Sequence, residues 1–294
     1  MRLGAFQLDE PLPGLKEPHA LATLHPWIDV GNVSTLTLSW LETHLETKEL
    51  TRLAKPGSFF DFTRYRPTSY YQEGRRQLTI PNTYITYGQQ KTGNDFLILH
   101  LLEPHSHSEL YIESLLRLLA KFNVKRYYLI GSMYDLVPHT RPLLVTGGGI
   151  GKGVEQELEK MGLESSNYQG PTTIVSMVPQ RAQDLEIETM SLIVHLPQYT
   201  KLDDDYMGTV RLMKVLASLY DLPIDATYVQ KAEQQLDQIN AAVDNNPQLK
   251  AIVEQLESHY EARATRKKEE EETPRLSTEV EKFLLEMDRR FREG

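Results

Sequence analysis

Two apolar runs decide the fold: FLILHLL at residues 96–102 and YYLIG at residues 127–131. Each has about the length of one β-strand and is apolar at nearly every position. A strand with one face in water alternates apolar and polar residues, whereas a strand covered on both faces does not. The two runs therefore predict strands inside a sheet that has helices on both sides.

The same alternation of short β-rich runs and helical patterns continues up to about residue 225, which is typical of an α/β layer architecture. Aromatic and β-branched residues between Gly57 and Gly93, interrupted by turn residues, predict antiparallel pairing added to the main sheet. Further strands are expected at 20–24, 76–80, 83–87 and 188–196, and helices at 33–45, 108–122 and 203–220.

Beyond residue 225 the pattern is helical only. Apolar residues recur at steps of three and four up to Val243, and Asn246 and Pro247 suit the start of a second helix that repeats the pattern from Leu249 to Tyr260. Two helices joined by so short a break predict an antiparallel hairpin. We therefore divide the chain into an α/β core over 1–225 and a helical extension over 226–294.

The extension ends with two segments of different character. Residues 263–275 are strongly charged without an apolar face, which indicates a solvated helix end and linker. A final amphipathic helix is expected to follow, docking on its own chain or, as the alternative, on a partner. Its apolar stripe consists of Val280, Phe283, Leu284, Met287 and Phe291.

Composition excludes several classes of function. The 294 residues include 41 acids and 32 bases, a net charge of −9, whereas a nucleic-acid-binding protein is expected to be basic. No cysteine is present, which excludes disulfides, thiolate metal sites and cysteine nucleophiles. No apolar run approaches the length of a membrane span or of a signal peptide, so we expect a cytoplasmic protein with no membrane contact.

Three familiar site patterns fail on their spacing. LLVTGGGIGKG at 143–153 lacks the glycine and the hydroxyl of a phosphate-binding loop, so a flexible loop entering a helix is expected there. EPHSHSE at 103–109 offers two histidines, but a catalytic metal site usually needs three converging ligands. Ser132 does not lie in the GxSxG pattern of a hydrolase. We therefore expect no metal, no cofactor and no catalytic residue of these kinds.

Two loops that follow strands remain as candidates for a ligand pocket. PWIDVGN at 26–32 offers Trp27, Asp29 and Asn32, at a position where α/β folds bind ligands. VPHTRP at 137–142 offers His139 as a base and Arg141 as a binder of an anionic group. Alternatively, Asp29 or Asn32 caps a helix and Trp27 belongs to the core. The pocket requires all five side chains to converge.

Several segments also carry a likeness to a known family. The chain resembles the proteasome assembly chaperone 2 (PAC) family, and its bacterial branch with a C-terminal helical part most closely, from about residue 20 to 290. The segments that carry the likeness are HPWIDVGN (25–32), FFDFTRYRPT (59–68), Glu103-Pro104, VPHTRP (137–142), YQGPTTIVSMV (168–178), HLPQY (195–199) and VEKFLLEM (280–287).

The resemblance implies a three-layer α/β/α core, similar to phosphorylase/hydrolase-like folds, and self-association into a homo-oligomer, with a trimer as the working expectation. It favours a non-enzymatic interaction or assembly protein. The chain ends Arg292-Glu293-Gly294, whereas proteasome-docking members end in a hydrophobic–Tyr–any tail, so docking by that tail is not expected. The alternative function is a small-molecule-binding or hydrolase-like protein that uses the loops 26–32 and 137–142.

Overall fold

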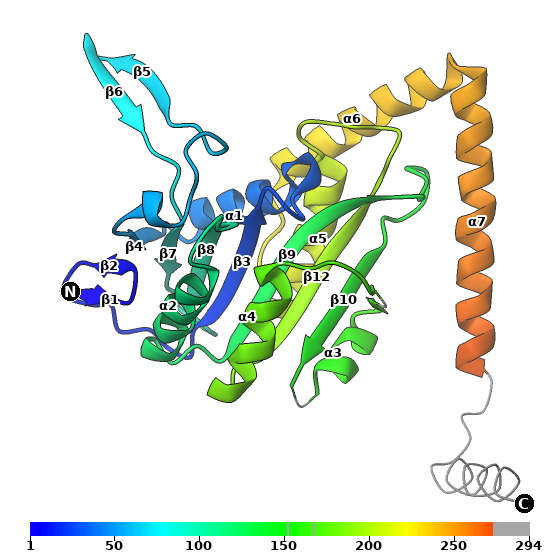
Figure 1. The fold of residues 1–294 in the computed structure, drawn as a ribbon. Helices are drawn as coiled ribbons and strands as arrows, with labels where there is room; N and C mark the ends of the chain where they lie inside the picture. The colour runs from blue at the N-terminus through cyan, green and yellow to red at the C-terminus, as the bar shows by residue number, and fades with distance from the viewer. Residues whose placement is uncertain (152, 167, 273–294) are drawn as a thin grey trace, which may run out of the picture.

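The sheet at the centre of the molecule has ten strands in the order β1-β2-β4-β7-β8-β3-β9-β12-β10-β11. The structure, a computed structural model, describes residues 1–151, 153–166 and 168–272 (Figure 1). Its middle consists of four mutually parallel strands, which confirms the two apolar runs as interior strands. These are β8 (Phe96–Leu102), β3 (His19–His25), β9 (Arg126–Asp135) and β12 (Glu188–Pro197).

Shorter strands extend the sheet on both sides of this parallel centre. On the β8 side all pairings are antiparallel, and on the β12 side β10 pairs antiparallel with β12 and parallel with β11. These strands are β7 (Tyr84–Gly88), β4 (Lys48–Leu53), β2 (Phe6–Leu8) and β1 (Arg2–Leu3), then β10 (Val145–Ile150) and β11 (Glu164–Ser165).

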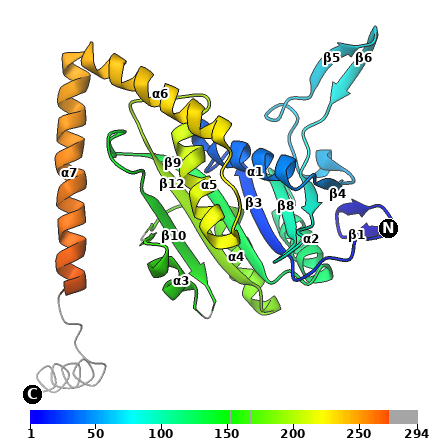
Figure 2. The same ribbon diagram turned by 180° about the vertical axis from the view of Figure 1, so that it is seen from behind.

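Helices cover both faces, which confirms the expected three-layer α/β/α core (Figures 1 and 2). Along β9, Tyr127 and Leu129 join the apolar cluster on one face, while Tyr128 and Ile130 join the cluster on the other. The first face packs against α2 (Ser108–Lys121) and α4 (Ile174–Ala182), and the second against α1 (Val33–His44), α3 (Val154–Lys160) and α5 (Tyr206–Tyr220). Short 3-10 turns lie at Val30–Asn32, Pro56–Ser58 and Gln183–Leu185.

Residues 145–150 of the glycine-rich segment form the strand β10, so the prediction of a flexible loop is wrong there, whereas the expected helix does begin at Val154. A Cβ at Gly147 would lie 2.4 Å from Leu158 Cδ2, and one at Gly149 would lie 2.5 Å from Val154 Cγ1. Both of these atoms belong to α3, which packs directly on this strand, and the Cβ at Gly149 would also lie 2.4 Å from the Thr189 carbonyl oxygen of β12. The glycines therefore serve a close approach between helix and strand.

The segment between Gly57 and Gly93 divides into two antiparallel parts. β7 joins the main sheet between β4 and β8, as expected. The strands β5 (Thr68–Gln72) and β6 (Arg75–Thr79) form a separate two-stranded sheet. Both views show this hairpin projecting away from the body of the molecule (Figures 1 and 2).

Two long helices follow the core, α6 (Ala226–Asp244) and α7 (Pro247–Glu272). Asn246 Oδ1 accepts the backbone N–H groups of Gln248 and Leu249, which confirms the predicted cap. The helices diverge from their connection, so they do not form the closely paired hairpin that the short break predicts (Figures 1 and 2). The charged segment from 263 is helical up to residue 272, and the predicted final helix, with Val280 to Phe291, lies outside the described residues.

None of the helices in the described part of the chain combines the length and the apolar character that crossing a bilayer requires.

Candidate functional site

The candidate loops leave the sheet at one common edge. β3, β9 and β12 are parallel neighbours, so their carboxyl ends meet there. The loop 26–32 follows β3, and 136–142 follows β9. Ligands of open α/β sheets usually bind outside such an edge. The side chains in these loops therefore decide whether the edge forms a pocket.

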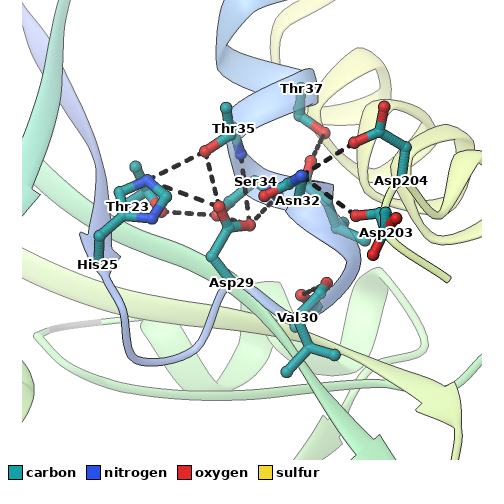
Figure 3. A network of polar contacts seen from close by, with 12 residues as sticks. Thr23, His25, Asp29, Val30, Asn32, Ser34, Thr35, Thr37, Asp203 and Asp204 are labelled. Atoms are coloured by element: carbon teal, nitrogen blue, oxygen red, sulfur yellow. Dashed lines mark hydrogen bonds and ion pairs between the residues drawn. The ribbon is translucent and has the colours of Figure 1, made fainter. Parts of the chain in front are cut away.

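Asp29 is buried and holds the beginning of α1 (Figure 3). Its Oδ1 accepts the Ser34 backbone N–H at 2.7 Å and the Ser34 hydroxyl at 2.5 Å, and its Oδ2 accepts the Thr35 hydroxyl at 2.6 Å. The peptide N–H groups at a helix start have no partner within the helix, and Asp29 supplies one. This is the capping role that the sequence offered as the alternative to ligand binding.

The proton positions around Asp29 follow from its charge. A carboxylate only accepts, so the Ser34 and Thr35 hydroxyls donate their single protons to Asp29 and can only accept in their other hydrogen bonds. The buried Thr23 hydroxyl then donates to Ser34 Oγ at 2.6 Å, and His25 Nε2–H donates to Thr35 Oγ1 at 3.0 Å (Figure 3). Burial lowers the pKa of His25, which favours this neutral ring. Both carboxylate oxygens are thus occupied by the fold itself.

The other two residues of this loop point to different surroundings. Asn32 Nδ2 donates to the Asp203 carbonyl at 3.1 Å and to Asp204 Oδ1 at 2.9 Å, which joins the loop to the segment before α5. Trp27 is 54% exposed, so the alternative expectation of a core tryptophan is wrong.

The end of β9 touches this loop through its backbone. Ser132 donates its N–H to the Ile28 carbonyl at 2.7 Å and its hydroxyl to the Val30 carbonyl at 2.6 Å. A Cβ at Gly131 would lie 2.2 Å from that same Ile28 carbonyl, so only glycine permits the approach. Ser132 thus holds the loop 26–32 against the sheet.

His139 is buried and has a partner on each ring nitrogen. Its Nε2–H donates to the Asn240 amide oxygen of α6 at 3.1 Å, which leaves Nδ1 to accept the Tyr199 hydroxyl at 2.5 Å. The Tyr199 oxygen in turn accepts the His139 backbone N–H at 2.8 Å. Burial lowers the pKa of His139, so the ring is neutral. A general base needs a lone pair that can reach substrate, and here Tyr199 occupies it.

Arg141 joins the same loop to α7. Its guanidinium donates to Glu257 Oε1 at 2.9 Å and to Glu261 Oε1 at 2.7 Å, two acids one helical turn apart. Hydrogen bonding to Glu261 raises the pKa of Arg141. Thr140 also donates to Glu257, and the Tyr260 hydroxyl donates to the Pro142 carbonyl at 2.9 Å. The anionic group that Arg141 binds is therefore supplied by α7.

The five candidate residues thus have separate partners. Among the residues that the structure describes, no hydrogen bond or ion pair joins Trp27, Asp29 or Asn32 to His139 or Arg141. The first loop is bonded to α1 and the segment before α5, and the second to α6 and α7. The first loop fastens α1 to the sheet, and the second loop fastens α6 and α7.

Sequence reasoning missed a relay on the neighbouring strands. His195 Nδ1–H donates to Asp135 Oδ2 at 2.8 Å, and the Thr146 hydroxyl donates to His195 Nε2 at 2.8 Å. The hydrogen bond from His195 lowers the pKa of Asp135. These residues come from β9, β12 and β10, and Thr146 belongs to the segment expected to be a loop. The alternation of β12 could have placed His195, but its partner Thr146 could be found only by recognising β10.

The two histidines of EPHSHSE do not share a ligand. The His105 ring accepts the Asp61 backbone N–H at 3.1 Å, while His107 Nδ1 lies 3.0 Å from the Ser58 carbonyl. Within 1–151, 153–166 and 168–272, no three side chains of histidine, aspartate or glutamate gather as metal ligands.

Comparison with known proteins relates this arrangement to one family. The profile of the PAC2 family matches residues 23–244, and the last matched residue is the last residue of α6. None of the curated proteins matches the chain.

Three solved structures share the fold. A protein of unknown function from Mycobacterium tuberculosis has a TM-score of 0.79 at 22% identity, covering 92% of this chain and 93% of its own. A PAC2 family protein from Streptomyces avermitilis has a TM-score of 0.71 at 22% identity, covering 80% and 99%. A proteasome-assembly chaperone homologue from M. tuberculosis has a TM-score of 0.70 at 20% identity, covering 80% and 99%.

Proposed function

The chain belongs to the PAC2 family, and on that premise we propose that it is a cytoplasmic, non-enzymatic protein that associates with copies of itself and assists the assembly of other proteins. The proposal takes three copies as its working number. It draws on the structural relative described as a proteasome-assembly chaperone homologue. In this protein the surface helices would contact other proteins, and the polar side chains at the carboxyl ends of the strands would hold those helices in place.

One observation carries the proposal: the polar side chains expected to form a pocket serve as fastenings. Asp29 accepts its hydrogen bonds from α1, His139 is held between Tyr199 and α6, and Arg141 is paired with α7. Catalysis needs groups that can reach a substrate, whereas a scaffold needs its surface helices held rigidly. The side chains at the carboxyl ends of β3 and β9 hold helices and so suit a scaffold.

The helical end of the chain is the part best suited to a protein partner. α7 lies beyond the family match and is joined to the core by Arg141, Tyr260 and Arg263, the last of which donates to Glu164 of β11. The stripe from Val280 to Phe291 follows it in the chain, and we propose that this stripe contacts the partner.

The test is affinity capture of the full chain from native extract of its source cells, followed by mass spectrometry and sizing of what is captured. We expect a partner protein to be captured in stoichiometric amount, as a subunit that is not yet assembled into its complex. This capture should be lost when residues 274–294 of the present chain are deleted. A matched control carries Lys91→Glu and Lys121→Glu, two exposed positions on the core. Capture of a small metabolite in place of a protein would contradict the proposal, as would a truncated chain with unchanged partners.

The second candidate is a hydrolase, favoured by the relay of Asp135, His195 and Thr146. In that function Thr146 Oγ attacks an ester carbonyl carbon while its proton passes to His195 Nε2. The alcohol leaves with that proton, and water then releases the acid from the acylated threonine. Burial of both His195 and Thr146 favours the first proposal.

An ester substrate such as p-nitrophenyl acetate separates the two candidates. We expect equal rates for the natural chain and for Thr146→Val, which keeps the side-chain shape and removes the hydroxyl. Turnover that the substitution abolishes, with the fold intact by circular dichroism, would establish the hydrolase instead.

A further inference from the structure

The hairpin β5–β6 projects from the core of the molecule (Figures 1 and 2). We call residues 64–80 the arm. Every residue of both strands is exposed, and both views show them projecting from the body (Figures 1 and 2). Five residues of strand span about 17 Å, so the tip of the arm lies well away from the body of the molecule.

The base of the arm is nevertheless fixed. Phe59 and Phe60, just before it, are buried in the core cluster. The Tyr65 hydroxyl lies 3.1 Å from the Glu103 carbonyl and 3.3 Å from the His25 carbonyl, and its ring stacks at a tilt on His105, 4.7 Å between centroids. A flexible surface loop would not need such contacts at its base. The arm is therefore held out in a set direction from a rigid base.

One face of the arm is apolar and basic. The register pairs Ser69 with Leu78 and Tyr71 with Arg76, and paired residues share a face of the sheet. Tyr71 is 76% exposed and Leu78 59% exposed, although each is a large apolar side chain. An isolated two-stranded hairpin is only marginally stable in water. The composition of this face is therefore typical of a surface that packs against another protein.

Charge indicates what covers it. The arm contains Arg64, Arg66, Arg75 and Arg76 against Glu73 alone, a net charge of +3. Since the chain carries −9, the residues outside the arm together carry −12. A basic arm on an acidic body is complementary to the body of another copy, whereas the body repels nucleic acid and anionic membranes.

We propose that the arm docks on the acidic body of a second copy of this chain, covering Tyr71 and Leu78 and neutralising its arginines. The inference rests on the self-association in the proposed function and specifies its contact. Each copy would then both offer an arm and receive one.

The absence of cysteine from the sequence permits a direct test by cross-linking. Tyr71→Cys in the full chain, labelled with a benzophenone maleimide and illuminated, should give a covalent product of two chains, with the adduct mapped by mass spectrometry to acidic segments of the body. Lys121→Cys, exposed on α2, is the matched control and should give much less of that product. Products confined within one chain would overturn the proposal.

Charge reversal provides the second test. Arg75→Glu with Arg76→Glu should raise the dissociation constant of self-association by about tenfold or more, and high salt should weaken the natural assembly. The control Lys91→Glu with Lys121→Glu makes the same change in net charge and should leave association unchanged. Unchanged association of the arm variant would overturn the proposal.

The outcomes separate this inference from the proposed function. Copies that associate without the arm would overturn the docking contact and leave self-association standing. Copies that associate through the arm but capture no client protein would uphold the contact and contradict the role in assembly. In cell extract, cross-linking of Tyr71→Cys to a different protein instead of a second copy would overturn the proposed occupant.

Discussion

His139 Nε2 donates a hydrogen bond to the Asn240 amide oxygen at 3.1 Å, which ties the loop after a central strand to α6. A histidine at the carboxyl end of a parallel strand suggests catalysis, but this ring has both nitrogens engaged and is buried. Two residues later Arg141 makes the equivalent link to α7. One short loop thus fastens both helices of the extension to the core.

Replacement of Arg141 should loosen α7 without disturbing the core. Arg141→Ala removes the contacts to Glu257 and Glu261, so we expect faster amide hydrogen exchange over 247–263 and unchanged exchange in β9 and β12. Arg117→Ala is a matched control, because Arg117 pairs with Glu113 of its own helix. Unchanged exchange in α7 would show that the loop does not hold this helix.

Asp29 should contribute to stability through its cap. Asp29→Ala leaves the Ser34 N–H and two hydroxyls without their acceptor, and we expect a loss of about 2–4 kcal/mol in the free energy of unfolding by urea. Asp29→Asn keeps one acceptor oxygen and should lose less. Asp237→Ala, at an exposed position of α6, should change stability little. A stable Asp29→Ala variant would return Asp29 to the list of candidates for ligand binding.

Two neighbouring glycines test why β10 is rich in glycine. A Cβ at Gly147 would meet Leu158 Cδ2 at 2.4 Å, so Gly147→Ala should cost about 1–3 kcal/mol and lower the melting temperature. At Gly148 the nearest atom would be Ser191 Oγ at 3.6 Å, so Gly148→Ala should be tolerated. Equal effects at the two positions would contradict close packing of α3 as the reason.

Acid should destabilise the fold through His19. Burial, and secondly the charge of Arg126, lower the pKa of His19 from 6.5 to about 4, and its Nδ1 lies 2.8 Å from the Tyr220 hydroxyl. The unfolded chain therefore binds a proton at higher pH than the folded chain does. The stabilisation is complete above pH 6.5 and is lost as the pH falls toward 4.

Urea unfolding at several pH values measures this contribution. His19→Gln does not titrate and should show a shallower decline over that range than the natural chain. His259→Gln, at an exposed position of α7, should follow the natural chain. Parallel curves for the natural chain and His19→Gln would contradict the role assigned to His19.

The interior of the fold could be predicted from the sequence, while its margins could not. The runs at 96–102 and 127–131 become β8 and β9 because continuous apolar sequence has no other stable place than a covered sheet. β10 was not predicted because Gly147 and Gly149 are explained by the close packing of α3, a tertiary contact that the local sequence does not reveal. β1 and β11, of two residues each, are too short to leave a periodic pattern.

The residues of the candidate site could be predicted from the sequence, and so could the cap that Asp29 forms, but the roles of His139 and Arg141 could not. The sequence identified Asp29, His139 and Arg141 as unusual, and each does make specific contacts. Ser34, which Asp29 caps, lies only 5 residues away along the chain, whereas Asn240 and Glu257, the partners of His139 and Arg141, lie 101 and 116 residues away. A role set by a contact over such a distance follows from the fold and not from local spacing.

The most direct measurement is the mass of the full chain in solution, by sedimentation equilibrium at near-physiological salt over a range of concentrations. A protein that associates with copies of itself should sediment with a mass that is a whole multiple of the single-chain mass. We expect the mass of three copies. A single-chain mass at every concentration would contradict it.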